Sequence, residues 1–171
     1  MTHIFVLNSY PTAGKDSFVD MISARHEGIF KMSSVDLVKQ VARVAGWDGT
    51  KTSKNRKFLS DLKDLLTEWN DVPYYDIENR IKEIEFYNKY DKPILIFVMV
   101  REPKEIQKMV DRLGAKTIFI NRPCLNNVKQ SNHADNDVKN YTYDYYIDND
   151  GDIDMLIDKA ENFYQMIVKG E

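Results

Sequence analysis

A run of seven apolar residues, Ile94 to Val100, is the feature that most restricts how this chain can fold. Its β-branched and aromatic residues favour a strand. Because no polar residue interrupts the run, both faces of that strand should be covered, which is typical of a central strand in a parallel sheet. Pro93, directly before the run, suits the entry into a strand. The run therefore predicts a buried parallel sheet.

Four shorter apolar runs alternate with helical patterns along the chain. The five predicted strands are Ile4 to Leu7, Ile29 to Met32, Ile94 to Val100, Thr117 to Ile120 and Tyr145 to Ile147. Apolar residues at helical spacing predict helices over Val35 to Ala45, Phe58 to Trp69, Ile77 to Tyr87, Ile106 to Leu113 and Ile153 to Ile167. This alternation predicts an α/β fold whose sheet is wound by right-handed crossovers.

The helix predicted at 58–69 has the clearest apolar pattern. Its apolar residues are expected to face the core and its charged residues to face solvent. The first group is Phe58, Leu59, Leu62, Leu65, Leu66 and Trp69, and the second is Asp61, Lys63, Asp64 and Glu68. Elsewhere, Gly114 is expected to end the helix before it, and Asp152 to cap the last helix.

The connection between the second and third predicted strands is long and contains about three helices, so it can form a lobe above the carboxyl edge of the sheet. Ligands bind at that edge in folds of this kind. Two polar stretches, 48–56 and 121–140, have the composition of connections that could close over a substrate.

The composition limits the class of protein. With 171 residues, 43% of them hydrophobic, the chain has the length of a single domain over 1–171. A net charge of −3 provides no electrostatic footprint for nucleic acid or for an anionic membrane. No run approaches the ~20 apolar residues that cross a bilayer, and the N-terminus has no signal-peptide pattern. The single cysteine, Cys124, excludes an internal disulfide, so we expect a cytoplasmic protein.

Residues 3–17 lead an apolar strand into a loop whose Gly14-Lys15 pair opens a helix. Backbone N–H groups at a helix N-terminus attract anions, and a lysine beside a glycine can reach the outer phosphates of a nucleotide. The usual pattern is Gly, four residues, Gly-Lys and then Ser or Thr, but here Ser9 replaces the first glycine and Asp16 replaces the hydroxyl residue. Ser9 is small enough for a tight turn, and Asp16 could bind Mg²⁺ directly or through water. The alternative is an ordinary helix start, with Asp16 at the positive end of the helix dipole.

Through Ala13-Gly14-Lys15-Asp16-Ser17 and the order of its elements, the chain resembles the P-loop nucleotide kinases, and within them the phage-type deoxynucleoside monophosphate kinases. Animal phosphomevalonate kinases share this Gly-Lys-Asp variant, so the motif indicates a kinase without fixing its acceptor. The resemblance implies a three-layer α/β fold, with a five-stranded parallel sheet ordered 2-3-1-4-5 and helices on both faces. It also implies ATP and Mg²⁺, a helical acceptor-binding lobe at about 34–90 and a lid at about 121–140.

Phosphoryl transfer depends on positioning and charge neutralisation, so cations should line the cleft. The predicted nucleotide contacts are Ser9, Thr12, Ala13, Gly14, Lys15, Asp16 and Ser17, and Lys15 is expected to stabilise the transferred phosphoryl group. Arg101 and Glu102 follow the central strand at its carboxyl end. We expect Arg101 to contact the acceptor phosphate, and Glu102 to hold Mg²⁺ through water where a small kinase usually places an aspartate. Alternatively, both are exposed residues before a helix that begins at Pro103.

Ser33, Lys39 and Arg56 are expected to bind the acceptor together with Arg101. Ser33 ends the second predicted strand and Lys39 lies on the following helix, although Ser33 is equally suited to cap that helix. Arg56 lies in a cationic helix N-terminus, which is unfavourable unless an anion compensates, so it suits either a phosphate clamp or a solvated face. Arg122, the arginine of the expected lid, is the candidate for a catalytic contact with the transferred group.

Three other patterns receive structural interpretations. His133 has no partner cluster at ligand spacing and is expected to be a surface residue. Residues 148–152 have the composition of a calcium loop, but aligning Gly151 to the required turn leaves positions that need carboxylates without them. We expect a strand end, a turn and a helix cap there instead. The tyrosines over 141–146 are expected to pack on the sheet.

The sequence thus predicts an ATP-dependent kinase with Mg²⁺, whose partners are a nucleotide donor and a small phosphorylated acceptor. A nucleoside or deoxynucleoside monophosphate is the first choice of acceptor, and a homodimer is among the possible assemblies. One alternative is a non-catalytic nucleotide-binding module, which the departures at Ser9 and Asp16 would suit. A phosphomevalonate-type kinase and a polynucleotide kinase are the others, and the acidic balance disfavours nucleic acid.

Overall fold

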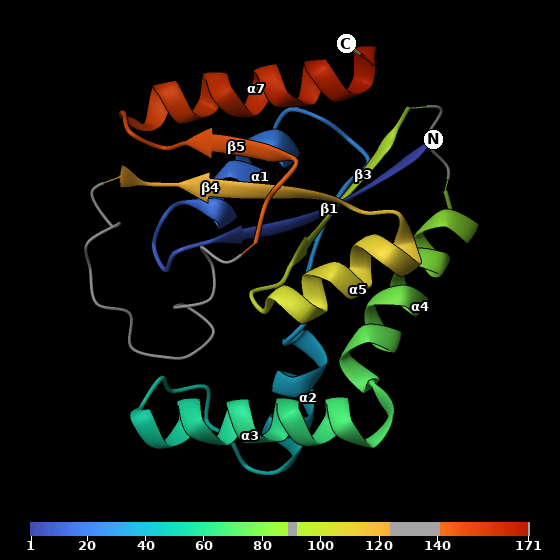
Figure 1. The fold of residues 1–171 in the computed structure, drawn as a ribbon, viewed down its shortest axis with the longest axis vertical. Helices are drawn as coiled ribbons and strands as arrows, with labels where there is room; N and C mark the ends of the chain where they lie inside the picture. Colours follow the sequence, from blue (N-terminus) through green and yellow to red (C-terminus); the bar gives the residue numbers. More distant parts are fainter. Residues whose placement is uncertain (89–91, 124–140, 171) are drawn as a thin grey trace. The chain divides into compact units, whose positions relative to one another are not determined.

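The structure is a computed structural model and describes residues 1–88, 92–123 and 141–170 (Figure 1). Its strands are β1 (Thr2–Ser9), β2 (Ile29–Ser33), β3 (Ile94–Met99), β4 (Lys116–Asn121) and β5 (Tyr145–Asp148). Its helices are α1 (Lys15–Ser23), α2 (Asp36–Val44), α3 (Ser53–Asn70), α4 (Val72–Phe86), α5 (Pro103–Leu113) and α7 (Ile153–Lys169).

The five strands form one sheet in the order β2-β3-β1-β4-β5. β1 lies in the middle and runs parallel to both neighbours, so that Val6 is opposite Val98 of β3 and Thr117 of β4. Every residue of β3 is buried, as its unbroken apolar run predicts. All five predicted strands are present, and the predicted sheet order is confirmed.

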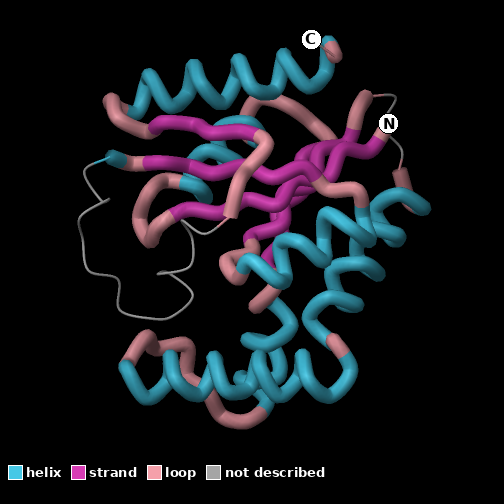
Figure 2. The backbone as a smooth tube through the Cα atoms, in the orientation of Figure 1, coloured by secondary structure: helices cyan, strands magenta, loops and turns pink. Residues whose placement is uncertain are grey.

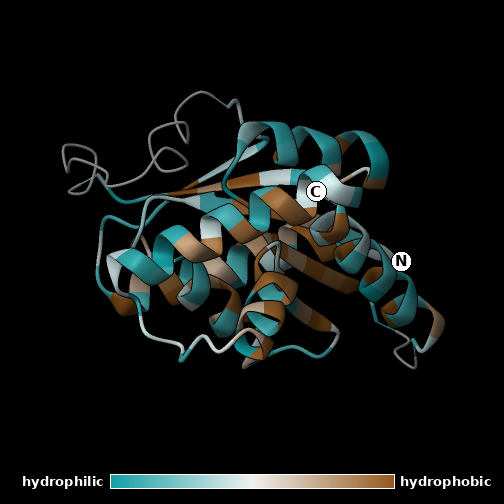
Figure 3. Ribbon diagram, turned by 90° about the horizontal axis from the view of Figure 1, so that it is seen from below, coloured by the Kyte–Doolittle hydropathy of each residue, from teal (hydrophilic) through white to brown (hydrophobic). Residues whose placement is uncertain are grey.

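Helices cover the two faces of this sheet (Figures 1 and 2), which gives the α/β fold three layers. α1 and α7 pack together on one face, and α5 covers the other. Between the sheet and α7, the Phe5 ring stacks on Phe97 at 5.4 Å between centroids and meets Phe163 edge-on at 5.3 Å. In Figure 3 the strands are mostly brown, because their side chains form this core. In the loop that joins β1 to α1, Tyr10 and Ala13 are also buried.

Residues 32–88 form a compact unit of their own, which contains α2, α3 and α4. Within it, the Arg80 guanidinium lies 3.3 Å from Asp36 Oδ2 and 3.6 Å from Asp76 Oδ2, and so ties α4 to α2. The range predicted for the acceptor-binding lobe, about 34–90, falls on this unit. Its acceptor-binding role stays a prediction.

The face that α3 buries agrees with the predicted one only in part. As predicted, Leu59, Leu62 and Leu66 are half-buried, and Asp61, Asp64 and Glu68 are exposed. Lys63 is the one buried residue of α3, at 7% exposed, whereas Leu65 is 62% and Trp69 82% exposed. The prediction of a buried Leu65 and Trp69 and a solvated Lys63 was therefore wrong. The pattern correctly predicted a helix, but an apolar stripe does not fix which side of a helix the neighbouring elements cover.

The predicted helix ends are confirmed. Gly114 ends α5 in the left-handed conformation, and Asp152 Oδ1 accepts from the Met155 backbone N–H at the start of α7. The Tyr143 ring packs against Phe119 on the sheet, as expected for strand packing. In the ranges that the structure describes, no helix has the length and apolar character needed to span a membrane.

Candidate phosphate-binding site

The loop between β1 and α1 is a tight turn at the carboxyl end of the central strand. The Ala13 N–H donates to the Tyr10 carbonyl at 3.2 Å, and Ser9 Oγ donates to the same carbonyl at 2.8 Å. Thr12 has φ 63° and Gly14 has φ 97°, so two residues of the turn are left-handed. Ser9 is buried in this turn, and its predicted contact with a nucleotide stays a prediction.

The first turn of α1 has open hydrogen-bond donors. Gly14 is its N-cap residue and has no side chain to accept from them. Within residues 1–88, 92–123 and 141–170, nothing accepts from the backbone N–H groups of Gly14, Lys15, Asp16 or Ser17. The first protected amide is that of Phe18, which donates to the Gly14 carbonyl at 2.9 Å. Four adjacent donors at the positive end of a helix form a site for an anion.

Asn149, from the turn between β5 and α7, holds this loop from the other side. Its Nδ2 donates to the Ala13 carbonyl at 2.9 Å. A Cβ atom added to Gly14 would lie 2.6 Å from Asn149 Nδ2, which is closer than van der Waals contact allows. A side chain at position 14 would therefore be strained by the positive φ and would also displace the Asn149 amide.

Asn149 is itself fixed to β4, since its backbone N–H donates to the Asn121 carbonyl at 2.6 Å. Lys159 of α7 binds the Asp148 carbonyl and the Asp150 carboxylate on either side of Asn149. Sequence reasoning assigned residues 148–152 to a turn and a cap but did not find the contact with the loop. The two partners are 136 residues apart in the chain.

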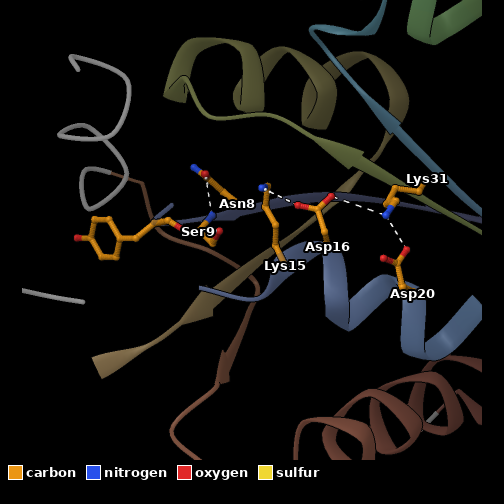
Figure 4. Close-up of polar contacts among 7 residues, drawn as sticks. Asn8, Ser9, Lys15, Asp16, Asp20 and Lys31 are labelled. Atoms are coloured by element: carbon orange, nitrogen blue, oxygen red, sulfur yellow. Dashed lines mark hydrogen bonds and ion pairs between the residues drawn. The ribbon is translucent and has the colours of Figure 1, made fainter. Parts of the chain in front are cut away.

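The cations and carboxylates beside the loop form a chain of ion pairs (Figure 4). Lys15 Nζ lies 3.1 Å from Asp16 Oδ2, and Lys31 of β2 bridges Asp16, at 3.7 Å, and Asp20. Partial burial raises the pKa of the Asp16 carboxyl, but the hydrogen bond and charge of Lys15 and the charge of Lys31 outweigh this, so the pKa is lowered. Asp16 is thus held ionised, and its side chain remains 61% exposed.

Asn8, which sequence reasoning missed, joins the loop to the neighbouring strand. This buried residue precedes Ser9, and its Nδ2 donates to the Arg101 carbonyl at 3.2 Å and to the Tyr143 hydroxyl at 2.8 Å. Its Oδ1 accepts from the Ser9 N–H at 2.8 Å. A polar residue at the end of an otherwise apolar strand was the available signal, because a buried amide must find partners.

The bond from Asn8 places the start of the Arg101-Glu102 segment beside the loop. Both residues follow β3 at the carboxyl edge, and both are half-buried. Arg122, directly after β4, reaches the loop itself, since its Nη1 donates to the Thr12 carbonyl at 3.4 Å. The sheet thus brings three of the predicted site residues to one edge, and their roles stay predictions.

Ser33, Lys39 and Arg56 belong to the helical unit over residues 32–88 and not to the unit that carries the loop. Ser33 Oγ accepts from the Val35 N–H at 3.4 Å, and the Ser33 N–H donates to Asp36 Oδ2 at 2.8 Å. These bonds form the turn that leads into α2. Arg56 is exposed on α3. Most of the predicted lid, including Cys124 and His133, lies outside the described residues.

The residues beside the loop fit a magnesium ion that arrives with a nucleotide. Mg²⁺ is usually held by one or two carboxylates together with phosphate oxygens and water. Asp16 offers one exposed, ionised carboxylate at the loop. In the described part of the chain, no three His, Cys, Asp or Glu side chains gather as a metal cage. A nucleotide would have to supply the remaining oxygens.

Comparison of the structure with solved structures identifies its fold class. Dephospho-CoA kinase from Campylobacter jejuni matches over 99% of both chains with a TM-score of 0.64, at 13% sequence identity. The tunicamycin resistance protein of Deinococcus radiodurans matches over 96% of both chains with a TM-score of 0.56, at 10% identity. The chain has the P-loop kinase-like fold.

No protein-family model and no curated protein sequence matches the chain. At identities of 10% and 13%, the structural matches establish the fold and leave the reaction to be argued from this chain's own residues.

Proposed function

We propose that this protein transfers the γ-phosphoryl group of ATP to a small phosphorylated acceptor, a nucleoside or deoxynucleoside monophosphate. The observation that carries the proposal is the open first turn of α1. Its four backbone donors, over residues 14–17, sit beside the Lys15 ammonium at the carboxyl end of the central strand. A polyphosphate chain is the ligand whose repeated anionic oxygens match such a row of donors.

In the proposed reaction, an oxygen of the acceptor phosphate attacks the γ-phosphorus, and the bond to the oxygen that bridges the β- and γ-phosphates breaks. The products are ADP and the acceptor with one additional phosphate. Lys15 would leave Asp16 and bind the transferred group, since a phosphate competes for its ammonium. Mg²⁺, when bound with the nucleotide, neutralises charge on the β- and γ-phosphates.

The other predicted site residues would have the roles expected from the sequence. Arg122 already contacts the loop at the Thr12 carbonyl, and its guanidinium would stabilise charge on the transferred group. Arg101 and Glu102, at the same edge, would bind the acceptor phosphate and a water of the metal shell. Ser33, Lys39 and Arg56 would bind the rest of the acceptor from the helical unit. The resemblance to phage-type deoxynucleoside monophosphate kinases supports this choice of acceptor.

Lys15→Ala is the variant that tests the transfer step. We expect it to abolish ADP formation in the presence of ATP, Mg²⁺ and each common nucleoside monophosphate, because transition-state charge loses its main cation. Folding should remain cooperative, because Lys15 is the first residue of α1 and its ion pair with Asp16 is exposed. Lys104→Ala, at an exposed lysine on α5, is the matched control and should leave the rate unchanged.

The assay should include phosphomevalonate and a 5′-hydroxyl oligonucleotide as acceptors, because these separate the rival kinases. A wild-type chain that turns over none of these acceptors would contradict the proposal. Calorimetric binding of ATP and Mg²⁺ without turnover would then favour the second candidate, a non-catalytic nucleotide-binding module. The observation that favours this candidate is the Lys15–Asp16 ion pair, in which the Asp16 carboxylate already binds the ammonium that is expected to act in catalysis.

A further inference from the structure

α3 carries an apolar stripe that the fold leaves exposed. The stripe consists of Phe58, Leu62, Leu65 and Trp69, which recur on one side of the helix at steps of about one turn. Leu62 is half-buried, but Phe58 is 37%, Leu65 62% and Trp69 82% exposed. A contiguous exposed stripe of this kind on a helix is typical of an interaction surface.

The exposed charges of α3 are separated along its length. Lys54, Arg56 and Lys57 lie in its first turns, and Asp61, Asp64 and Glu68 lie beyond them. The first turn contains no acidic residue and the last turn no basic one, so the charges oppose the helix dipole at both ends. This arrangement is unfavourable for α3 alone.

From these observations we propose that the stripe of α3 is a dimer interface that binds α3 of a second copy in the antiparallel direction. Only an antiparallel arrangement places the basic end of each helix against the acidic end of the other. In that arrangement the two helix dipoles also point in opposite directions, which is favourable. A parallel pair would place like charges together. A two-fold axis between residues 63 and 64 places Phe58 opposite Trp69 of the second copy, and Leu62 opposite Leu65 of the second copy.

The same register brings Lys57 near Glu68 of the second copy, twice in the dimer. On a helical wheel these two residues flank the same side of the stripe, and a two-fold axis brings matching sides of the two helices together. Lys57 now binds Asp61 of its own helix at 2.7 Å, and its side chain is 76% exposed, so it can reach a second acceptor. Arg56 lies about 160° around the helix from Phe58 and stays outside the interface.

Sedimentation velocity of the full chain over a range of concentrations tests the dimer. We expect a monomer–dimer equilibrium in the wild type, with the dissociation constant raised at least about 100-fold by Trp69→Ala, because a large aromatic side chain that packs on Phe58 of the second copy is removed from both copies. Ser60→Glu, at an exposed position off the stripe, is the matched control and should leave the constant unchanged. Far-UV circular dichroism should show the same helix content in both variants, since Trp69 is already exposed.

Charge reversal tests the direction of the pair. Lys57→Glu and Glu68→Lys should each raise the dissociation constant of their homodimers by about tenfold. An equimolar mixture of the two variants should form heterodimers at close to wild-type affinity, because each Lys57–Glu68 contact is then again between opposite charges. Native mass spectrometry distinguishes the heterodimer by mass when one variant is isotope-labelled.

The chain has two tryptophans, so Trp47→Phe leaves Trp69 as the only indole reporter. We expect the emission of Trp69 to shift to shorter wavelength as concentration rises, because the dimer removes the ring from water. A wild type that stays monomeric at every concentration would overturn the proposal. So would a dimer that tolerates both Trp69→Ala and the charge reversals. A monomer whose Trp69 emission responds to a nucleoside monophosphate would assign the stripe to a small ligand instead. All these readouts are independent of kinase activity.

Discussion

At the scale of single residues, Gly14 combines two constraints. Its φ of 97° disfavours any side chain, and Asn149 Nδ2 occupies the space where a Cβ would lie. Gly46 has a similar φ of 92° but nothing within 4 Å of its Cβ position. Comparing Gly14→Ala with Gly46→Ala therefore separates the cost of backbone strain from the cost of displacing Asn149.

Gly14→Ala should lower the free energy of unfolding by about 1–2 kcal/mol from strain, as Gly46→Ala should. For Gly14→Ala the free energy of unfolding should fall by about 1 kcal/mol more, because the hydrogen bond from Asn149 to the Ala13 carbonyl is broken. In the Asn149→Ala background, Gly14→Ala should cost no more than Gly46→Ala does. Urea unfolding of the four chains of this cycle measures the coupling. Strict additivity of Gly14→Ala and Asn149→Ala would show that Asn149 does not restrict the loop.

At the scale of elements, Asp144 fixes the entry of β5 to the start of β4. Its Oδ2 accepts from the Thr117 N–H and from Thr117 Oγ1, both at 2.7 Å, and Lys116 lies 3.7 Å from Oδ1. Partial burial raises the pKa of the Asp144 carboxyl, but the hydrogen bonds from Thr117 and the charge of Lys116 outweigh it, so the pKa is lowered.

A lowered folded-state pKa means that Asp144 stabilises the fold above its unfolded pKa, near pH 4, and that this contribution is lost as the pH falls through the folded pKa. Asp144→Asn should therefore lower the free energy of unfolding by about 1 kcal/mol at neutral pH, a modest value because the side chain is 39% exposed. The difference from wild type should shrink as the pH is lowered below about 4. Asp158→Asn, exposed on α7, is the control. A difference that does not change with pH would mean that the Asp144 carboxylate is not the source.

The sequence predicted which segments become strands and helices, because hydrophobic periodicity is a local signal. The run from Ile94 to Val100 even predicted the burial of β3 on both faces. The face of α3 was predictable only in part: Leu65 and Trp69 have the periodicity of core residues but are exposed. If α3 forms the proposed dimer, the pattern indicates burial against a second copy and not within one chain.

The same distinction applies to the candidate site: some of its residues were predictable from local sequence and others were not. The loop residues were predictable because Gly14 and Lys15 are adjacent and follow a strand directly. Asn8 and Asn149 were not, since each acts through contacts with residues more than 90 positions away in the chain. Such contacts depend on the order of strands in the sheet, which a motif alone does not contain.

At the scale of the whole molecule, the two compact units carry different groups of the residues proposed to bind ligands. Met1–Lys31 and Lys89–Glu171 carry the phosphate loop and Arg101, and Met32–Asn88 carries the other residues proposed to bind the acceptor, Ser33, Lys39 and Arg56. A ligand that binds only the folded form stabilises what it contacts, by about 2.7 kcal/mol at a hundredfold excess over its dissociation constant. Where the units open separately, that stabilisation stays within the unit that holds the ligand.

Hydrogen exchange followed by mass spectrometry can therefore assign the two ligands to the two units. With ADP alone, we expect slower exchange in α1 and the end of β1, and little change in α3 or α4. With a nucleoside monophosphate alone, we expect the reverse. In Lys15→Ala the ADP effect should disappear and the monophosphate effect should remain, since Lys15 lies in the loop unit. Equal protection of both units by ADP alone would mean that they unfold as one body. Protection of α1 by the monophosphate and not by ADP would place the acceptor at the loop and contradict the proposed roles.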